Sequence, residues 1–234
     1  MRTWFIIPAA GGGHRIGGDR PKQYQSLAGK PMLQHTLNRL DQVPDIAGGV
    51  IALAHEDPFW AEIEVPRSWP LVTCVGGAER NDSVLAALEH LHARAAPEDW
   101  VLVHDAARPL VRLDDIVRLR DVATREGIGG ILSVPVADTL KRATQTNQTA
   151  RIVETVDRQQ LWRALTPQMF PLQALRDALQ QAREAGIVVT DEAQAMECMG
   201  VQPHLVQAAA DNLKITHPED WALAEQILRS QSLS

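Results

Sequence analysis

The sequence predicts a single α/β domain, residues 1–234, in which a mainly parallel central sheet is flanked by helices. The 234 residues fit one large domain, and 45% of them are hydrophobic, which is enough for one core. Short apolar runs alternate with amphipathic segments, as in β-α-β units. Most runs are apolar throughout, which is typical of strands covered on both faces. Together these observations indicate a Rossmann-like fold.

Six apolar runs are the candidate strands of this sheet. They are Trp4–Ile7, Val50–Leu53, Leu71–Val75, Trp100–Val103, Ile131–Val134 and His204–Val206. Between them, apolar side chains recur at three- or four-residue spacing, which places them on one face of a helix. One such stripe extends from Leu33 to Leu40, and another from Val84 to Leu91.

Two later helices carry signals at their ends. The amphipathic segment Leu172–Ala185 is followed by Gly186, a common helix stop. The last helix is expected to begin near Thr216, which can cap it, with Pro218 in the first turn and Glu219 completing a capping box. Both signals are structural.

The segment Asp138–Arg158 breaks the α/β rhythm. It is polar and rich in threonine, and it has little to bury except Ile152 and Val153. We interpret it as a protruding two-stranded arm, which needs a partner surface because a lone hairpin is marginally stable and an open edge invites pairing. A homodimer through the arm is the natural hypothesis. The composition fits an irregular surface loop equally well.

Charge and apolar content exclude several partners. The formal net charge of −6 argues against a nucleic-acid-binding protein, which normally has a basic domain or stripe. The first apolar run ends at Pro8 and is too short for a signal sequence or a membrane span. We therefore expect a cytoplasmic protein without a membrane partner. The two cysteines are far apart in sequence and indicate neither a disulfide framework nor a cysteine metal site.

Residues 8–23, directly after the first strand, are dense in glycine and cationic side chains. Open α/β sheets bind ligands at the carboxyl ends of their strands, where this segment lies. Glycines let backbone N–H groups approach a phosphate, and Arg15, Arg20 and Lys22 can neutralise it. A dehydrogenase is disfavoured because Ile16 stands where G-x-G-x-x-G needs a glycine, and no P-loop pattern aligns. We predict a phosphate-binding loop rather than a flexible turn.

An ordered set of blocks carries a resemblance to a known family. Its members are A-A-G-x-G-x-R with P-K-Q in residues 9–23, then Gly76–Val84, Val103–Pro109, Pro135–Lys141, Thr155–Arg158, Leu165–Gln168, Thr190–Ala193 and Asp211–Thr216. Each block alone has low specificity. Together, over nearly the whole chain, they resemble the 2-C-methyl-D-erythritol 4-phosphate cytidylyltransferases of the non-mevalonate isoprenoid pathway.

The resemblance implies a nucleotidyltransferase that joins CTP and 2-C-methyl-D-erythritol 4-phosphate into 4-diphosphocytidyl-2-C-methyl-D-erythritol and releases pyrophosphate. It also implies Mg²⁺ or another divalent cation and a homodimer through the arm. One alternative is a ribitol 5-phosphate cytidylyltransferase of the same fold, which residue chemistry alone does not exclude. The other is a non-catalytic nucleotide-binding module, which would tolerate the loss of Arg15 or Lys22.

By the same resemblance, residues at matching positions receive roles. The triphosphate and nucleoside would be lined by Ala9, Ala10, Gly11 and Gly13, and the cytidine held by Gly77, Ala78, Ser83 and Ala106. The catalytic residues would be Arg15 and Lys22 at the CTP phosphates, with Arg158 and Lys214 at the substrate phosphate. The polyol and the metal region would be faced by Asp105, the candidate metal ligand, together with Arg108 and Thr139. Thr139 and Arg158, being on the arm, would enter the neighbouring subunit's site.

Other charged residues have structural interpretations. Arg80 and Asp82 are expected only to cap the helix that follows them, and the pair Asp114–Asp115 to complement a helix start. They are left out of the predicted catalytic set. Asp105 differs from them because it closely follows an apolar strand, at the edge where open sheets bind ligands.

Overall fold

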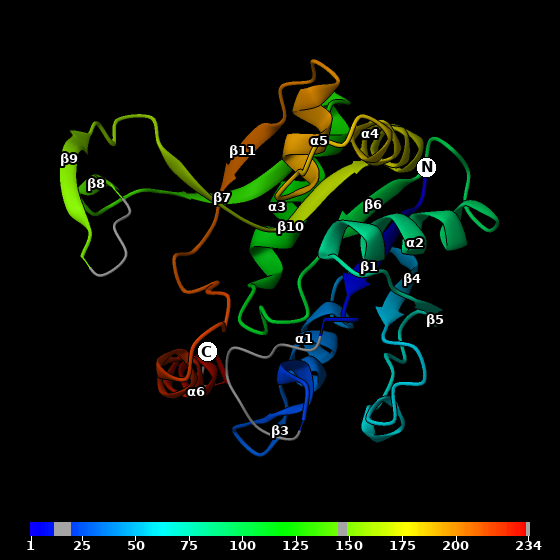
Figure 1. The fold of residues 1–234 in the computed structure, drawn as a ribbon. Coiled ribbons are helices and arrows are strands. Elements are labelled where there is room, and N and C mark those ends of the chain that lie inside the picture. The colour runs from blue at the N-terminus through cyan, green and yellow to red at the C-terminus, as the bar shows by residue number, and fades with distance from the viewer. Residues whose placement is uncertain (12–19, 145–148, 233–234) are drawn as a thin grey trace.

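The computed structural model describes residues 1–11, 20–144 and 149–232, and its centre is a seven-stranded sheet (Figure 1). The strands are β1 (Thr3–Pro8), β4 (Ile46–Leu53), β5 (Leu71–Val75), β6 (Trp100–Val103), β7 (Gly130–Pro135), β10 (Trp162–Pro171) and β11 (His204–Gln207). Their order is β11-β7-β10-β6-β1-β4-β5. Strand β10 is antiparallel to β6 and β7, and the other neighbouring pairs are parallel. The predicted mainly parallel sheet is confirmed.

Helices cover both faces of the sheet. They are α1 (Met32–Leu40), α2 (Arg80–His92), α3 (Leu113–Glu126), α4 (Leu172–Glu184), α5 (Glu192–Cys198) and α6 (Glu219–Ser232). Alternate residues of β1 point to opposite faces: Phe5 and Ile7 pack in the cluster that contains α1 and α3, whereas Ile6 packs with α2, α4 and α5. Because both faces are buried, the strands are apolar throughout.

Strand β10 is the element that the apolar pattern missed. It contains polar side chains and two prolines, so it lacks the continuous apolar run of the other central strands. Its pairing with β7 shifts between Ala164 and Gln168, and Pro167 lies in this irregular stretch. Proline is tolerated there because an irregular stretch needs no regular ladder hydrogen bond. The six predicted strands are all present, within a few residues of their expected ends.

The helix predictions agree with the structure, apart from the start of the last helix. Helix α4 ends just before Gly186, which has a φ of 67°. Helix α6 begins at Glu219, and the expected capping box is wrong. Asp220 accepts the backbone N–H groups of Thr216 at 2.7 Å and His217 at 2.8 Å, because its carboxylate, rather than that of Glu219, faces back along the chain.

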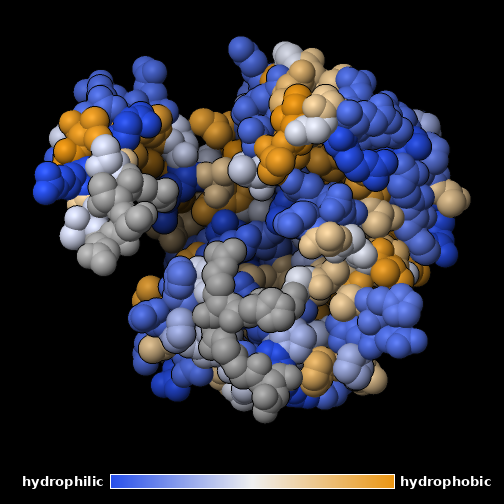
Figure 2. All heavy atoms as spheres, in the orientation of Figure 1, coloured by the Kyte–Doolittle hydropathy of each residue, from blue (hydrophilic) through white to orange (hydrophobic). Residues whose placement is uncertain are grey.

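The predicted arm is a two-stranded antiparallel hairpin rather than an irregular loop. It pairs β8 (Leu140–Thr144) with β9 (Arg151–Val156) and projects from the body of the molecule (Figure 1). Nearly all its side chains are exposed, including Ile152 and Val153. Figure 2 shows apolar surface among hydrophilic side chains on this arm.

The remaining small elements complete the fold. They are the short hairpin β2 (Ser26–Leu27) with β3 (Lys30–Pro31), and the 3₁₀ turns η2 (Lys22–Tyr24) and η3 (Trp60–Glu62). None of the helices within residues 1–11, 20–144 and 149–232 is long and apolar enough to cross a bilayer.

Candidate active site

A cavity of about 260 Å³ opens at the carboxyl ends of β1 and β6. The adjacent parallel strands β1 and β6 pair Ile6 with Val103, so the segments that follow them reach the same edge of the sheet. Ten of the residues predicted for the site line this cavity: Ala9, Ala10, Gly11, Lys22, Gly77, Ala78, Ser83, Asp105, Ala106 and Lys214. The structure thus brings together residues more than 200 positions apart in sequence.

The segment after β1 is fixed from two sides. The N–H of Ala9 donates to the carbonyl of Ala52 at 2.8 Å, and the side-chain amide of Gln23 donates to the carbonyl of Ala9 at 2.8 Å. In the turn η2, the ammonium of Lys22 donates to the carbonyl of Ile215 at 2.7 Å. Lys22 is therefore held beside the segment that contains Lys214, and both lysines line the cavity.

The turn before α2, residues 76–79, forms one wall of the cavity, which we call the glycine wall, and it needs glycine. A Cβ atom on Gly77 would lie 2.2 Å from Cβ of Asp82, and one on Gly76 would lie 2.5 Å from Cβ of Ala10. The N–H of Gly77 donates to the hydroxyl of Ser83 at 3.1 Å. Asp82 completes a capping box with Glu79, which confirms its predicted capping role. Small residues here leave space for a flat ring between the wall and the segment after β1.

Asp105 is the most strongly paired charge in the cavity. Its carboxylate contacts Arg80 Nε at 2.8 Å through Oδ1 and Lys214 Nζ at 2.9 Å through Oδ2, while Arg108 Nε lies 3.6 Å away. Burial alone would raise the pKa of Asp105, but the charges of these three cations outweigh it and hold the pKa far below its usual range. Asp105 is therefore an anion that orders the cations around it.

A buried histidine supports Asp105 from behind. The N–H of Asp105 donates to Oγ1 of Thr166 at 3.0 Å, and that hydroxyl lies 3.1 Å from Nδ1 of His104. His104 Nε2 lies 3.0 Å from the carbonyl of Arg108. These partners fit a neutral ring protonated at Nε2, with Nδ1 accepting from Thr166. Burial lowers the pKa of His104 to about 4, although the hydrogen bond to Arg108 opposes this shift.

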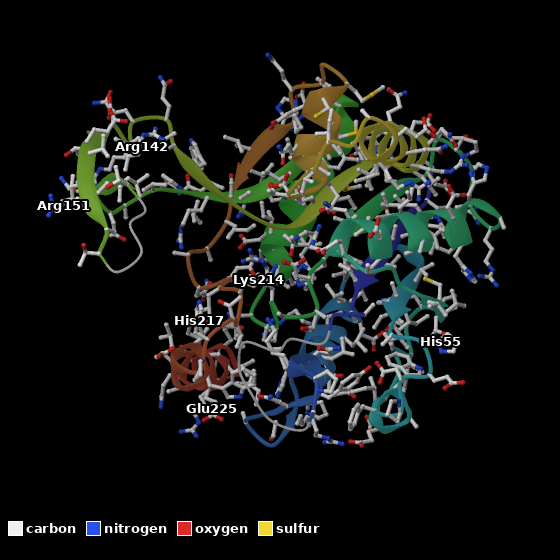
Figure 3. All side chains as sticks on the ribbon, viewed as in Figure 1. His55, Arg142, Arg151, Lys214, His217 and Glu225 are labelled. Atoms are coloured by element: carbon white, nitrogen blue, oxygen red, sulfur yellow. The ribbon has the colours of Figure 1, made fainter. Side chains whose placement is uncertain are left out.

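Other predicted residues lie elsewhere. Arg108 is buried behind Asp105 and donates to the carbonyl of Asn212 at 2.9 Å, so it does not line the cavity. Thr139 and Arg158 are exposed near the base of the arm and do not line the cavity of their own chain. Gly13 and Arg15 lie outside the described residues. Figure 3 places Lys214 in the middle of the molecule, well away from the arm.

Arg80 and Glu192 are charged residues that the sequence analysis did not assign to the site, and they form an ion pair at it. Arg80 lines the cavity, and it pairs with both Asp105 and the buried Glu192. The interpretation of Arg80 as only a helix cap is therefore wrong, because its guanidinium turns toward β6 and α5. Both residues lie within the ordered blocks Gly76–Val84 and Thr190–Ala193. Membership of those blocks was the available signal.

The side chains at the cavity determine how a metal ion could be held there. Within the described part of the chain, no group of three or more His, Cys, Asp or Glu side chains is placed to hold one. Of the residues that the structure describes, Asp105 and Glu79 contribute carboxylates to the lining of the cavity. Mg²⁺ commonly takes one or two carboxylates and completes its shell with water and substrate phosphates. The cavity fits a cation brought in with a triphosphate better than one held by protein ligands alone.

Comparison with known proteins decides the family. The family model for 2-C-methyl-D-erythritol 4-phosphate cytidylyltransferase matches residues 3–230. The chain belongs to this family. A 2-C-methyl-D-erythritol 4-phosphate cytidylyltransferase of Hahella chejuensis is 48% identical over 228 residues, covering 97% of this chain and 93% of that protein. The one of Ectopseudomonas mendocina is 49% identical over 226 residues, covering 96% and 95%.

Solved structures of the family share the fold. The crystal structure of a 4-diphosphocytidyl-2C-methyl-D-erythritol synthase matches with a TM-score of 0.83 at 36% identity, covering 97% of this chain and 98% of that chain. The 2-C-methyl-D-erythritol 4-phosphate cytidylyltransferase of Francisella tularensis matches with a TM-score of 0.79 at 33% identity, covering 97% and 100%. Family membership thus extends over the whole sheet, the cavity and the arm. A ribitol 5-phosphate cytidylyltransferase is not favoured by these matches.

Proposed function

We propose that this protein transfers the cytidylyl group of CTP to 2-C-methyl-D-erythritol 4-phosphate, forming 4-diphosphocytidyl-2-C-methyl-D-erythritol and pyrophosphate in isoprenoid precursor biosynthesis. The observation that carries this proposal is the family match over residues 3–230, combined with the meeting of the predicted cytidine and phosphate residues in one cavity. The glycine wall would hold the cytidine, and Lys22 and Lys214 would face the phosphates.

The chemistry suits a site built from cations rather than from a general base. In the proposed reaction a phosphate oxygen of the polyol phosphate attacks the α-phosphorus of CTP, and pyrophosphate leaves from the opposite side. A phosphate monoester has a second pKa near ~6, so at neutral pH the nucleophile is already an anion. The site must align two mutually repelling anions and stabilise charge during the transfer. Lys22 is held near the segment after β1 by its bond to Ile215, and it is our first choice for this role, together with the predicted Arg15.

A divalent cation is part of the proposal. Asp105 is the residue that would contact it, and the triphosphate oxygens would supply other ligands. When bound, Mg²⁺ would neutralise phosphate charge. Because Asp105 already contacts Arg80 and Lys214, we assign it at most one bond to the metal.

The second subunit completes the proposed site. Thr139 and Arg158 lie outside the cavity of their own chain, and the arm that carries them is exposed and projects from the body. A homodimer in which each arm reaches the partner's cavity would give both residues a role and cover Ile152 and Val153. The proposed location is the cytoplasm, as expected from the sequence.

A direct assay tests the proposed function. Purified protein is supplied with CTP, Mg²⁺ and either 2-C-methyl-D-erythritol 4-phosphate or ribitol 5-phosphate, and pyrophosphate release is followed. We expect turnover with the first polyol phosphate and a kcat/KM at least ~100-fold lower with the second, about the discrimination that two or three lost polar contacts provide. Binding of CTP without turnover on either substrate would favour the non-catalytic module.

A further inference from the structure

A buried chain of ion pairs joins α5, α2 and β6, and the proposed chemistry does not account for it. Arg80, the first residue of α2, contacts Glu192 through Nη1 at 2.6 Å and Nη2 at 3.0 Å. Its Nε contacts Asp105 at 2.8 Å. Glu192 is 0% exposed, whereas the Arg80 side chain is 24% exposed and lines the cavity. Each of the three guanidinium nitrogens thus contacts a carboxylate, and Nη1 also lies 3.5 Å from Oδ1 of Asn81.

Glu192 is held in place by β10. Asp191 caps α5 by accepting the N–H of Gln194 at 2.9 Å. From β10, the side chain of Gln168 donates to Asp191 at 2.9 Å and accepts the N–H of Ala193 at 2.8 Å. Because both neighbours of Glu192 are bonded to one side chain of the central sheet, the carboxylate has a fixed position.

The same strand fixes the other end of the chain of ion pairs. Thr166 of β10 accepts the N–H of Asp105, which sets the backbone of that residue. The side chain is then set by its two oxygens, since Arg80 binds Oδ1 and Lys214 binds Oδ2. A carboxylate held on both oxygens by different cations cannot rotate freely. The plane of Asp105, and hence the place of the Lys214 ammonium, depends on Arg80.

We propose that Arg80, anchored by Glu192, is a positioning residue that orients Asp105 and, through it, Lys214 for the phosphate of the second substrate. The inference rests on the proposed function for the identity of that substrate. We assign Arg80 no direct contact with a phosphate, because Nε, Nη1 and Nη2 each contact a carboxylate in this arrangement. The charges of this cluster support the assignment. It contains two carboxylates and three cations, so one positive charge is left for an anionic ligand. The carboxylates are Asp105 and Glu192, and the cations are Arg80, Arg108 and Lys214.

A purely structural tie between α2 and α5 is the competing explanation. Replacing both partners of a buried ion pair by apolar residues of similar volume is often neutral or stabilising. Such a pair is therefore a poor way to increase the stability of a fold. The side chain of Asn81 also joins α2 to the segment before α5, because it donates to the carbonyl of Val189. A tie that serves only stability does not need to place a cation against the cavity.

The double variant Arg80→Met with Glu192→Met separates the two explanations. It removes both charges of the pair, and the buried Asp105, which loses its contact with Arg80, keeps Lys214 and Arg108 as charge partners. We expect a melting temperature within a few degrees of wild type and a Kd for CTP within ~3-fold. We expect KM for the polyol phosphate to rise at least ~10-fold, as for the loss of one charge-assisted contact. A normal kcat/KM for that substrate would overturn the positioning role.

Matched variants control the experiment. Arg176→Met with Glu89→Met removes the 2.9 Å ion pair between α4 and the outer face of α2, away from the cavity, and should leave both constants unchanged. Arg80→Lys keeps the charge but cannot bridge two carboxylates, so we expect it to raise KM for the polyol phosphate as the double variant does. If the double variant does not fold, Arg80→Lys and Glu192→Gln decide: a KM within ~2-fold of wild type for both overturns the proposal. Turnover by the wild-type protein tests the proposed function separately.

Discussion

The cavity and the arm make opposite use of polar residues. At the cavity, Asp105 is 5% exposed, and contacts from β10, α2 and the segment before α6 fix it. On the arm, Ile152 is 68% exposed, and the side chains of Lys141 and Arg142 pair across the two strands with those of Thr155 and Glu154. In Figure 3, Lys214 lies near the middle of the view, where it lines the cavity, whereas Arg142 and Arg151 lie on the arm. In the proposed arrangement, one chain would build the nucleotide half of the site, and the arm would act on a second chain.

The largest effect on turnover is expected in the nucleotide half of the proposed site. Lys22→Ala should lower kcat by about 10²–10³-fold, because losing a preorganised donor at a developing charge has this cost in other enzymes. Steady-state pyrophosphate release measures it. Lys30→Ala is the matched control, since Lys30 is exposed on the short hairpin. Near-normal turnover by Lys22→Ala would show that the charge in this half comes from elsewhere.

The histidine behind Asp105 makes the cavity sensitive to acid. The folded pKa of His104 is about 4, below the unfolded value of about 6.5, so between these values the unfolded chain binds the extra proton. The stability from neutral His104 is fully present above pH ~6.5 and is lost as the pH falls toward 4. The loss approaches about 3 kcal/mol, at 1.36 kcal/mol per pKa unit. Urea unfolding at pH 7 and pH 4.5 measures it.

A variant isolates this contribution from other titrating groups. His104→Gln should have lower stability at pH 7 but a smaller decrease between pH 7 and pH 4.5 than wild type. The same decrease in both proteins would mean that His104 is not kept neutral by burial.

The arm should respond to changes that the isolated chain tolerates. Ile152→Asp with Val153→Asp places two charges on its exposed apolar surface, which should split the proposed dimer and lower kcat/KM on the order of 30-fold, since Thr139 and Arg158 would no longer reach a site. Analytical ultracentrifugation and pyrophosphate release measure the two effects. Val65→Asp, at a half-exposed apolar residue of the body, is the control. An active monomer would contradict the shared site.

A subtler change on the arm tests recognition of the phosphate. Arg158→Lys keeps the charge but loses the two parallel hydrogen bonds of a guanidinium, so KM for the polyol phosphate should rise about 10-fold while KM for CTP stays constant. Arg151→Lys on the same arm should change neither constant. A raised KM for CTP instead would place Arg158 at the nucleotide.

The sequence predicts those helices and strands whose pattern of apolar residues is visible within the element itself. Strands buried on both faces are apolar runs, and helix faces repeat at three or four residues, so these elements could be found from spacing alone. Strand β10 could not be found in this way. Thr166 and Gln168 are polar, Pro167 cannot donate a backbone hydrogen bond to a neighbouring strand, and the polar side chains make tertiary contacts instead. The side chains of Thr166 and Gln168 support Asp105 and α5.

The site was predictable for a related reason and only in part. Ten predicted residues line the cavity because motif blocks and strand ends point to the same edge. The role of Arg80 was missed because a residue at a helix start has a sufficient local explanation. Its contacts with Asp105, 25 positions away, and Glu192, 112 positions away, show where its side chain points. Sequence spacing contains no information on such a pair.

The smallest effect compares two ion pairs of equal length. Arg142 Nε and Glu154 Oε1 on the arm lie 2.6 Å apart, as do Arg80 Nη1 and Glu192 Oε1 at the cavity. The arm pair is exposed on both sides, so water screens it, and Glu154→Gln should change the free energy of unfolding by less than about 0.5 kcal/mol. Glu192 is fully buried, so Glu192→Gln leaves Arg80 partly uncompensated and should cost several times more. Chemical denaturation of both variants measures the difference. Equal costs would mean that burial does not distinguish the cavity from the arm, which is the basis of the comparison.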